Sequence, residues 1–165
     1  MANFSYDVVS ELDVSEINNV FDQVKREIAT RYDFKNTNSE IDWLNSKKEG
    51  LLVVSSNDLN LDSIVDIIRQ KLAKRNLSQN LIDLSKEKIT SNLKVSLDIP
   101  FKFGLDKDQT KQLNSILKSE FPKIKTQVIA ESVRVSSASK DELSRSINYL
   151  RSQSLEYPIQ FTNFR

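Results

Sequence analysis

The segment VVSSNDLNLDSIVDIIRQKL, residues 53–72, decides the fold because its pattern returns as VRVSSASKDELSRSINYL, residues 133–150. Both segments open with two valines followed by two serines, the pattern of a strand that runs into a turn. Each then places an acidic residue near the start of a helix, followed by apolar residues at helical spacing. One strand–helix unit therefore occurs twice, which predicts two copies of the same domain.

The residues around the first copy add four more elements. Alternating apolar residues predict strands, and apolar residues three and four apart predict helices. The predicted elements are, in order, a strand at 4–8, a helix at 15–32 capped by Ser15, strands at 41–43 and 51–54, a helix at 61–72 and a short strand at 81–84. Their order is βαββαβ, which is typical of a ferredoxin-like domain.

The residues around the second copy repeat this order. The predicted elements are a strand at 93–103, a helix at 113–121 ended by Pro122, strands at 123–131 and 132–137, a helix at 140–153 and a strand at 158–164. The strand at 93–103 is longer than an average strand, so we expect it to contribute to both sheets, with Pro100 at an edge or a bulge. We predict an α+β protein of two tandem ferredoxin-like βαββαβ sandwich domains with antiparallel sheets, at residues 11–90 and 91–165.

The composition is that of a globular protein and excludes several kinds of chemistry. Lysine and arginine number 24 against 23 acidic residues, so the net charge of +1 gives no overall attraction to nucleic acid. The sequence contains no histidine and no cysteine, which excludes disulfides, thiolate metal sites and serine–histidine catalysis within this chain. Only Gly50 and Gly104 are present, so neither a P-loop nor a dinucleotide-binding fingerprint exists. We expect no catalytic residues, no metal and no cofactor.

No targeting or membrane segment is recognisable. The start MANFSYDVV lacks a basic region followed by an apolar run, and no stretch approaches the roughly 18 apolar residues that span a bilayer. We therefore expect a cytoplasmic protein without a membrane partner, and a monomer.

The segment ATRYDFKNT, residues 29–37, allows two interpretations. Alternating cations and aromatic rings can hold a phosphorylated, ring-bearing ligand, or they can end a helix and place two rings in a core. Helical spacing from Ile28 puts Tyr32 on the inward face, and Phe34 is expected to close the core beneath the turn. Arg31 and Lys35 then point elsewhere.

Several segments of the chain, in order and spacing, resemble the YajQ family of bacterial nucleotide-binding proteins. They are FSYDVVSELDVSEINN (4–19), TRYDFKNT (30–37), KLAKRN (71–76), residues 123–152 and PIQFTNFR (158–165). The resemblance implies two ferredoxin-like domains that exchange their first strands, so that residues 3–10 pair in the sheet of the second half. It also implies binding of nucleotides or nucleic acid and, in some members, a response to cyclic di-GMP. Glycines usual in the family are replaced at Asn76 and Ala130, and Asn76 still suits the left-handed end of a helix.

The resemblance makes six cations the candidates for anion contact: Arg31, Lys35, Lys74, Arg75, Arg134 and Arg165. Because the two helices of the first half lie side by side, we expect Arg31, Lys35 and Arg75 to converge at their ends. The expected function is a non-enzymatic nucleotide-binding protein, with the finer hypothesis of a cyclic di-GMP effector that acts through a nucleic acid or a protein partner such as a transcription regulator. The alternative is a general RNA- or DNA-binding module.

Overall fold

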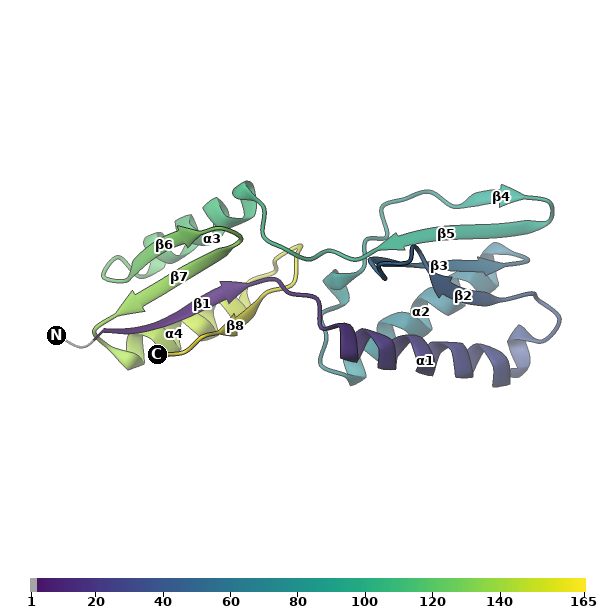
Figure 1. The fold of residues 1–165 in the computed structure, drawn as a ribbon, viewed down its shortest axis with the longest axis horizontal. Coiled ribbons are helices and arrows are strands. Elements are labelled where there is room, and N and C mark those ends of the chain that lie inside the picture. Colours follow the sequence, from purple (N-terminus) through teal and green to yellow (C-terminus); the bar gives the residue numbers. More distant parts are fainter. Residues whose placement is uncertain (1–2) are drawn as a thin grey trace. The chain divides into compact units, whose positions relative to one another are not determined.

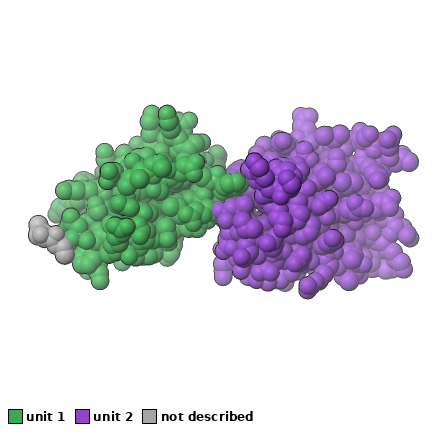
Figure 2. Space-filling model, in the orientation of Figure 1, with its two compact units in different colours: residues 1–11, 103–165 green, residues 12–102 purple. Residues whose placement is uncertain are grey.

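The computed structural model describes residues 3–165 and divides into two compact units (Figures 1 and 2). The central unit comprises residues 12–102, drawn in purple in Figure 2. The terminal unit, in green, combines residues 3–11 with residues 103–165. Each unit contains one four-stranded sheet and one hydrophobic core.

The central unit packs helices α1 and α2 on one antiparallel sheet whose strand order is β2-β3-β5-β4. Its core includes Val24, Ile64 and Ile99, each with less than 1% of its surface exposed. The elements are α1 (Val14–Thr30), β2 (Glu40–Trp43), β3 (Gly50–Ser55), α2 (Asp58–Lys74), β4 (Ile89–Ser91) and β5 (Lys94–Pro100), with 3-10 turns at Tyr32–Phe34 and Gln79–Leu81.

The terminal unit has the same architecture, with the strand order β6-β7-β1-β8. Tyr6, Val8, Val133 and Val135 form the buried side of this sheet and pack with Leu113 of its first helix. The elements are β1 (Phe4–Val9), α3 (Lys107–Glu120), β6 (Lys125–Ile129), β7 (Ser132–Ser137), α4 (Lys140–Ser152) and β8 (Gln160–Thr162).

The two units exchange their first strands. Strand β1 precedes α1 in the chain but pairs with β7 and β8, with Asp7 opposite Arg134 and Thr162. Strand β5 precedes α3 but pairs with β3 and β4. Each unit is therefore a complete βαββαβ sandwich whose first strand comes from the other half of the sequence, in agreement with the predicted fold class.

The structure corrects several predicted boundaries. The units divide at residue 102 rather than at 90, because β5 belongs wholly to the central sheet, where Ile99 lies opposite Leu51; it does not serve both sheets. The predicted strand at 81–84 is a 3-10 turn followed by one isolated bridge between Ile82 and Phe101. The strand that follows α2 is instead β4, at one edge of the central sheet, and all its residues are exposed. The N-cap of α1 is Asp13 rather than Ser15.

Candidate functional site

The end of α1 places two neighbouring rings in opposite environments. The Arg31 backbone leaves the helix with φ −73° and ψ 133°, although its N–H still donates to Glu27 O at 2.9 Å. The following 3-10 turn buries Phe34, which is 4% exposed, and leaves Tyr32 88% exposed. The expectation for Phe34 is confirmed, whereas the inward orientation predicted for Tyr32 is wrong because the helical register ends at Thr30.

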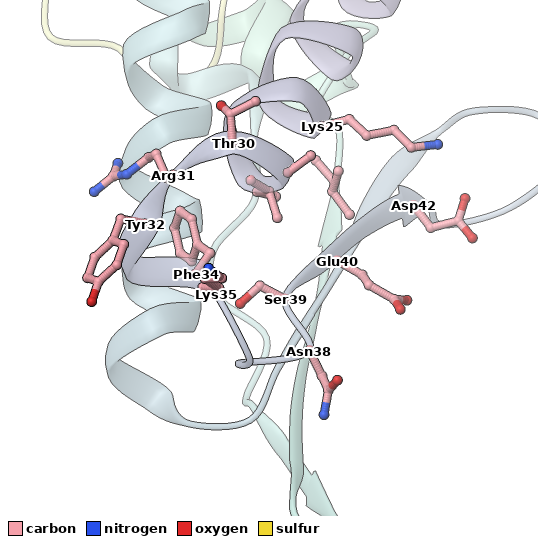
Figure 3. A pocket seen from close by; sticks show the side chains of 13 residues that line it. Lys25, Thr30, Arg31, Tyr32, Phe34, Lys35, Asn38, Ser39, Glu40 and Asp42 are labelled. Carbon is pink, nitrogen blue, oxygen red and sulfur yellow. The ribbon is translucent and has the colours of Figure 1, made fainter.

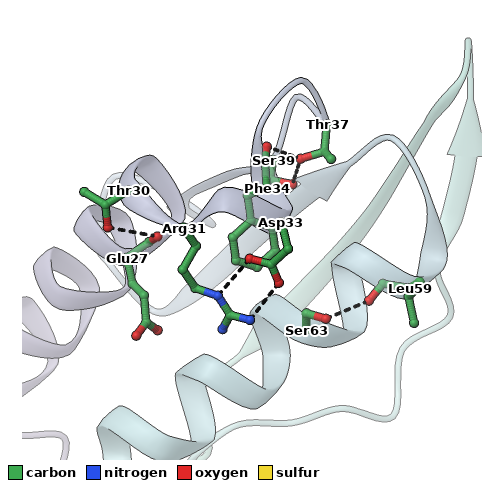
Figure 4. Close-up of polar contacts among 9 residues, drawn as sticks. All are labelled: Glu27, Thr30, Arg31, Asp33, Phe34, Thr37, Ser39, Leu59 and Ser63. Atoms are coloured by element: carbon green, nitrogen blue, oxygen red, sulfur yellow. Dashed lines mark hydrogen bonds and ion pairs between the residues drawn. The ribbon is translucent and has the colours of Figure 1, made fainter.

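Hydroxyl side chains fix the loop that follows the turn. Thr37 Oγ1 donates to Phe34 O at 2.5 Å and lies 2.6 Å from Ser39 Oγ (Figure 4). Ser39 Oγ in turn lies 3.0 Å from Ser55 Oγ. Ser56 N donates to Thr37 O at 2.9 Å, which ties the loop to the end of β3. Asn36 and Asn38 adopt φ of 62° and 51°, a left-handed conformation that asparagine tolerates better than most residues.

A pocket of about 860 Å³ opens between the C-terminal part of α1, this loop and the edge strand β2. Figure 3 shows Lys25 and Asp42 at one side of the pocket, Arg31 and Tyr32 at the opposite side, and Phe34 and Lys35 between them. Its volume falls in the range of about 300–1,000 Å³ found for small-molecule sites. The residues that line this pocket of the central unit therefore include three cations, one exposed ring and two carboxylates: Lys25, Arg31, Lys35, Tyr32, Glu40 and Asp42.

Arg31 is held by its neighbour Asp33. Arg31 Nε and Nη2 donate to the two carboxylate oxygens of Asp33 at 3.0 and 2.7 Å (Figure 4). These bonds lower the pKa of Asp33 and raise that of Arg31. The Arg31 guanidinium carbon also lies 5.0 Å from the Phe34 ring centroid. Both partners are exposed, so the pair contributes little to stability and can open for an incoming anion.

Arg75 does not join Arg31. Arg75 Nη1 contacts Glu16 Oε2 at 3.3 Å, in the first turn of α1, whereas Arg31 follows the last turn of this 17-residue helix. The two ends of such a helix lie about 25 Å apart. The predicted convergence is wrong because α1 and α2 run antiparallel, so their C-termini lie at opposite ends. Lys74 is exposed in the last turn of α2, next to Arg75.

Arg134 and Arg165 belong to the terminal unit, where both have structural contacts. Arg134 Nε and Nη2 donate to Asp7 at 2.9 and 3.3 Å, and Asn163 Nδ2 donates to the same carboxylate at 2.9 Å. Arg165 pairs its backbone with Ser5 at 3.0 and 3.2 Å, which extends β8 alongside β1. Asp7 is only 8% exposed, so Arg134 offsets a buried charge.

The ion pair between Arg134 and Asp7 should make the stability of the terminal unit fall at low pH. The hydrogen bond from Arg134 holds the pKa of Asp7 below its ordinary value of about 4. A lowered folded-state pKa stabilises the protein above the unfolded-state pKa, and this contribution disappears as the pH falls below about 4. We expect the thermal midpoint of the terminal unit to drop between pH 5 and pH 2 and expect Asp7→Asn to flatten that change, both measured by calorimetry. An equally steep pH dependence in Asp7→Asn would contradict this assignment.

Sequence reasoning missed Lys25, Glu40 and Asp42 as pocket residues. The alternation of Glu40, Ile41 and Asp42 was a usable signal, because it turns both acids away from the buried Ile41. Among residues 3–165, no group of three or more acidic side chains could hold a metal ion. Over the same residues, no helix has the length and apolar character needed to cross a bilayer.

Residues 4–165 match the model of a family described as nucleotide-binding protein YajQ-like. The chain belongs to this family. Proteins named nucleotide-binding protein are similar to it at 40% identity in Chloroherpeton thalassium, 38% in Prochlorococcus marinus and 36% in Nostoc punctiforme. These alignments cover 99% of this chain and 98 or 99% of each relative. In this YajQ-like chain, the segment TRYDFKNT ends α1 and forms one wall of the pocket.

Proposed function

We propose that the pocket beside Arg31 binds a nucleotide, and the exposure of Tyr32 is the observation that carries this proposal. A tyrosine ring that is 88% exposed contributes little to a core, yet Tyr32 lines the same pocket as the cations Arg31 and Lys35. Stacking on an aromatic face stabilises a nucleic-acid base by about 1–3 kcal/mol. Tyr32 therefore serves as the platform for the base.

The cations beside the ring receive the phosphates. Lys35 follows the 3-10 turn, and Arg31 precedes it, so the two side chains flank the base platform. Arg31 exchanges its bidentate contact with Asp33 for a similar contact with a phosphate, for which the guanidinium geometry is equally suited. The names of the relatives support a nucleotide as the ligand.

Binding without turnover is the activity that the residues favour. The chain lacks histidine and cysteine, and its two glycines do not form a phosphate-binding loop. We infer a cytoplasmic, monomeric effector that binds a nucleotide, with cyclic di-GMP as the candidate second messenger, and passes the signal to a nucleic-acid or protein partner. This proposal leaves out four of the cations expected from the sequence, because none of them lines the pocket: Lys74, Arg75, Arg134 and Arg165.

Calorimetric titration of cyclic di-GMP, GTP, ATP and a short RNA into the wild type and Tyr32→Ala tests the site. We expect one nucleotide per chain and a loss of roughly fivefold in affinity in Tyr32→Ala, about 1 kcal/mol, because the platform is removed. Tyr32→Phe keeps the ring and should bind as the wild type does. Binding of the RNA alone, with steep salt dependence, would favour a general nucleic-acid-binding module instead.

A further inference from the structure

Strand β6 forms one edge of the sheet of the terminal unit. Within residues 3–165 it pairs with β7 alone, from Lys125 opposite Ser136 to Ile129 opposite Ser132 (Figure 1). In an antiparallel pair, every second residue directs its N–H and C=O away from the partner strand. Val128 and Ile129 on this edge are 48% and 36% exposed. The edge thus offers unpaired backbone groups beside exposed aliphatic side chains.

A flank of lysines on α3 lies beside this edge. Lys107, Lys111 and Lys118 are spaced by four and seven residues and share one side of α3, while Leu113 and Leu117 face the core. Asn114 lies on the lysine side and accepts a hydrogen bond from Thr126 Oγ1 of β6, so this side of the helix faces β6. Gln112, on the other side, accepts a bond from Tyr157.

Two more lysines continue the positive charge along the strand. Lys123 precedes β6 and Lys125 begins it, and both are exposed. We call Lys107, Lys111, Lys118, Lys123, Lys125 and Val128 the β6 edge surface. A strand added along β6 would direct alternate side chains to its two faces, one toward the α3 lysines and the other toward Lys125. Acidic side chains at alternate positions of such a strand would all lie on one face, where they can contact the α3 lysines.

We propose that β6 takes up an extended acidic segment of a protein partner as a fifth strand of the terminal sheet. Backbone hydrogen bonds along the edge supply affinity, and the lysines of the β6 edge surface select acidic side chains. Val128 and Ile129 pack against the aliphatic parts of the incoming segment. The β6 edge surface lies in the terminal unit, whereas the pocket at Arg31 lies in the central unit. Peptide binding at β6 can therefore be tested independently of nucleotide binding.

Two other occupants fit the surface less well. An antiparallel pairing of β6 with a second copy would bring two lysine-rich edges together, and like charges in facing strands destabilise each other. A nucleic acid would use the lysines but would leave the backbone groups and the two exposed aliphatic side chains of β6 without partners. An acidic peptide strand provides partners for the lysines, for the backbone groups and for the two aliphatic side chains of β6.

The probe is a soluble ten-residue peptide that alternates glutamate and threonine, titrated into the isotope-labelled full chain. We expect amide chemical-shift changes concentrated in β6 and along α3. Methylating the peptide nitrogens that face β6 should abolish these changes, whereas methylating the alternate set should preserve them. A peptide with lysine in place of glutamate should not bind. Shift changes elsewhere, or none at all, would overturn the proposal.

Matched variants separate the charge contribution from folding. Lys111→Gln/Lys118→Gln should weaken peptide binding roughly fivefold, because two exposed ion pairs are lost. Lys47→Gln/Lys94→Gln changes the net charge equally in the central unit and should bind as the wild type does. Tighter binding of a twelve-nucleotide oligothymidylate to the same residues, or formation of dimers through β6 in sedimentation, would overturn the acidic-peptide assignment.

Discussion

Replacing Arg31 and Lys35 together by glutamine is expected to weaken nucleotide binding by roughly thirtyfold, about 2 kcal/mol. In the proposed site each cation contributes a charge-assisted hydrogen bond to phosphate, and neither supports the core, since both side chains are exposed. The thermal midpoint should therefore change little. The measurement is a calorimetric titration of the nucleotide that the wild type binds, with thermal melts of both proteins.

Asp33→Asn provides a control with an effect in the opposite direction. The Asp33 carboxylate holds the Arg31 guanidinium through contacts of 3.0 and 2.7 Å, so in the proposed site it would compete with phosphate. Removing its charge should release Arg31 and tighten nucleotide binding, while Lys47→Gln/Lys94→Gln should leave affinity unchanged. Full affinity in the Arg31/Lys35 variant, together with a loss in Lys74→Gln/Arg75→Gln, would move the site to the end of α2.

The local patterns predicted the helices well because burial repeats along them. Ile17, Val20 and Val24 face the core as their spacing indicates, and the valines of β7 are fully buried between half-buried neighbours. Asn76 adopts φ 58° at the end of α2, the left-handed conformation that its position suggested. These features depend on residues within a few positions of each other, so the sequence alone carries them.

Features set by the end of an element were predicted poorly. The spacing from Ile28 to Tyr32 is helical, but the helix ends between them, and the turn reverses the environment of the ring. Strand β4 has no buried residue, since Ile89 is 60% exposed, so hydrophobic alternation could not reveal it. Leu81 and Ile82 are buried without forming a strand, which shows that burial alone does not define one.

Which residues come together in the candidate site could be predicted only with the tertiary fold. Arg31 and Arg75 are both at helix C-termini, yet the antiparallel packing of α1 and α2 separates them. Lys25 and Asp42 lie at the same side of the pocket although the end of α1, a turn, a loop and part of a strand lie between them in the chain. Such juxtapositions depend on strand order and helix direction, which local periodicity does not specify.

Tyr6→Ala is expected to destabilise the terminal unit by about 3–5 kcal/mol, the usual cost of truncating a large buried aromatic residue. Tyr6 has less than 1% of its surface exposed, and its strand β1 lies in the interior of the sheet between β7 and β8. Its hydroxyl shares a 2.7 Å hydrogen bond with the buried Ser146, and its ring meets Phe161 edge-on at 5.7 Å. Amide exchange should therefore lose protection at Val133 and Val135, while Val53 and Leu97 of the central unit keep it.

Tyr6→Phe separates the ring from its hydroxyl. This variant keeps the core volume and should lose only about 1 kcal/mol, because Ser146 Oγ still donates to Leu143 O at 2.6 Å. Burial raises the pKa of Tyr6 to about 12, from its ordinary value near 10. The buried neutral form is thus favoured, and stability should fall as the pH rises from 10 toward 12 in the wild type, with a smaller fall in Tyr6→Phe. Equal loss of protection in both units of Tyr6→Ala would show that the exchanged strand couples their unfolding rather than completing one core.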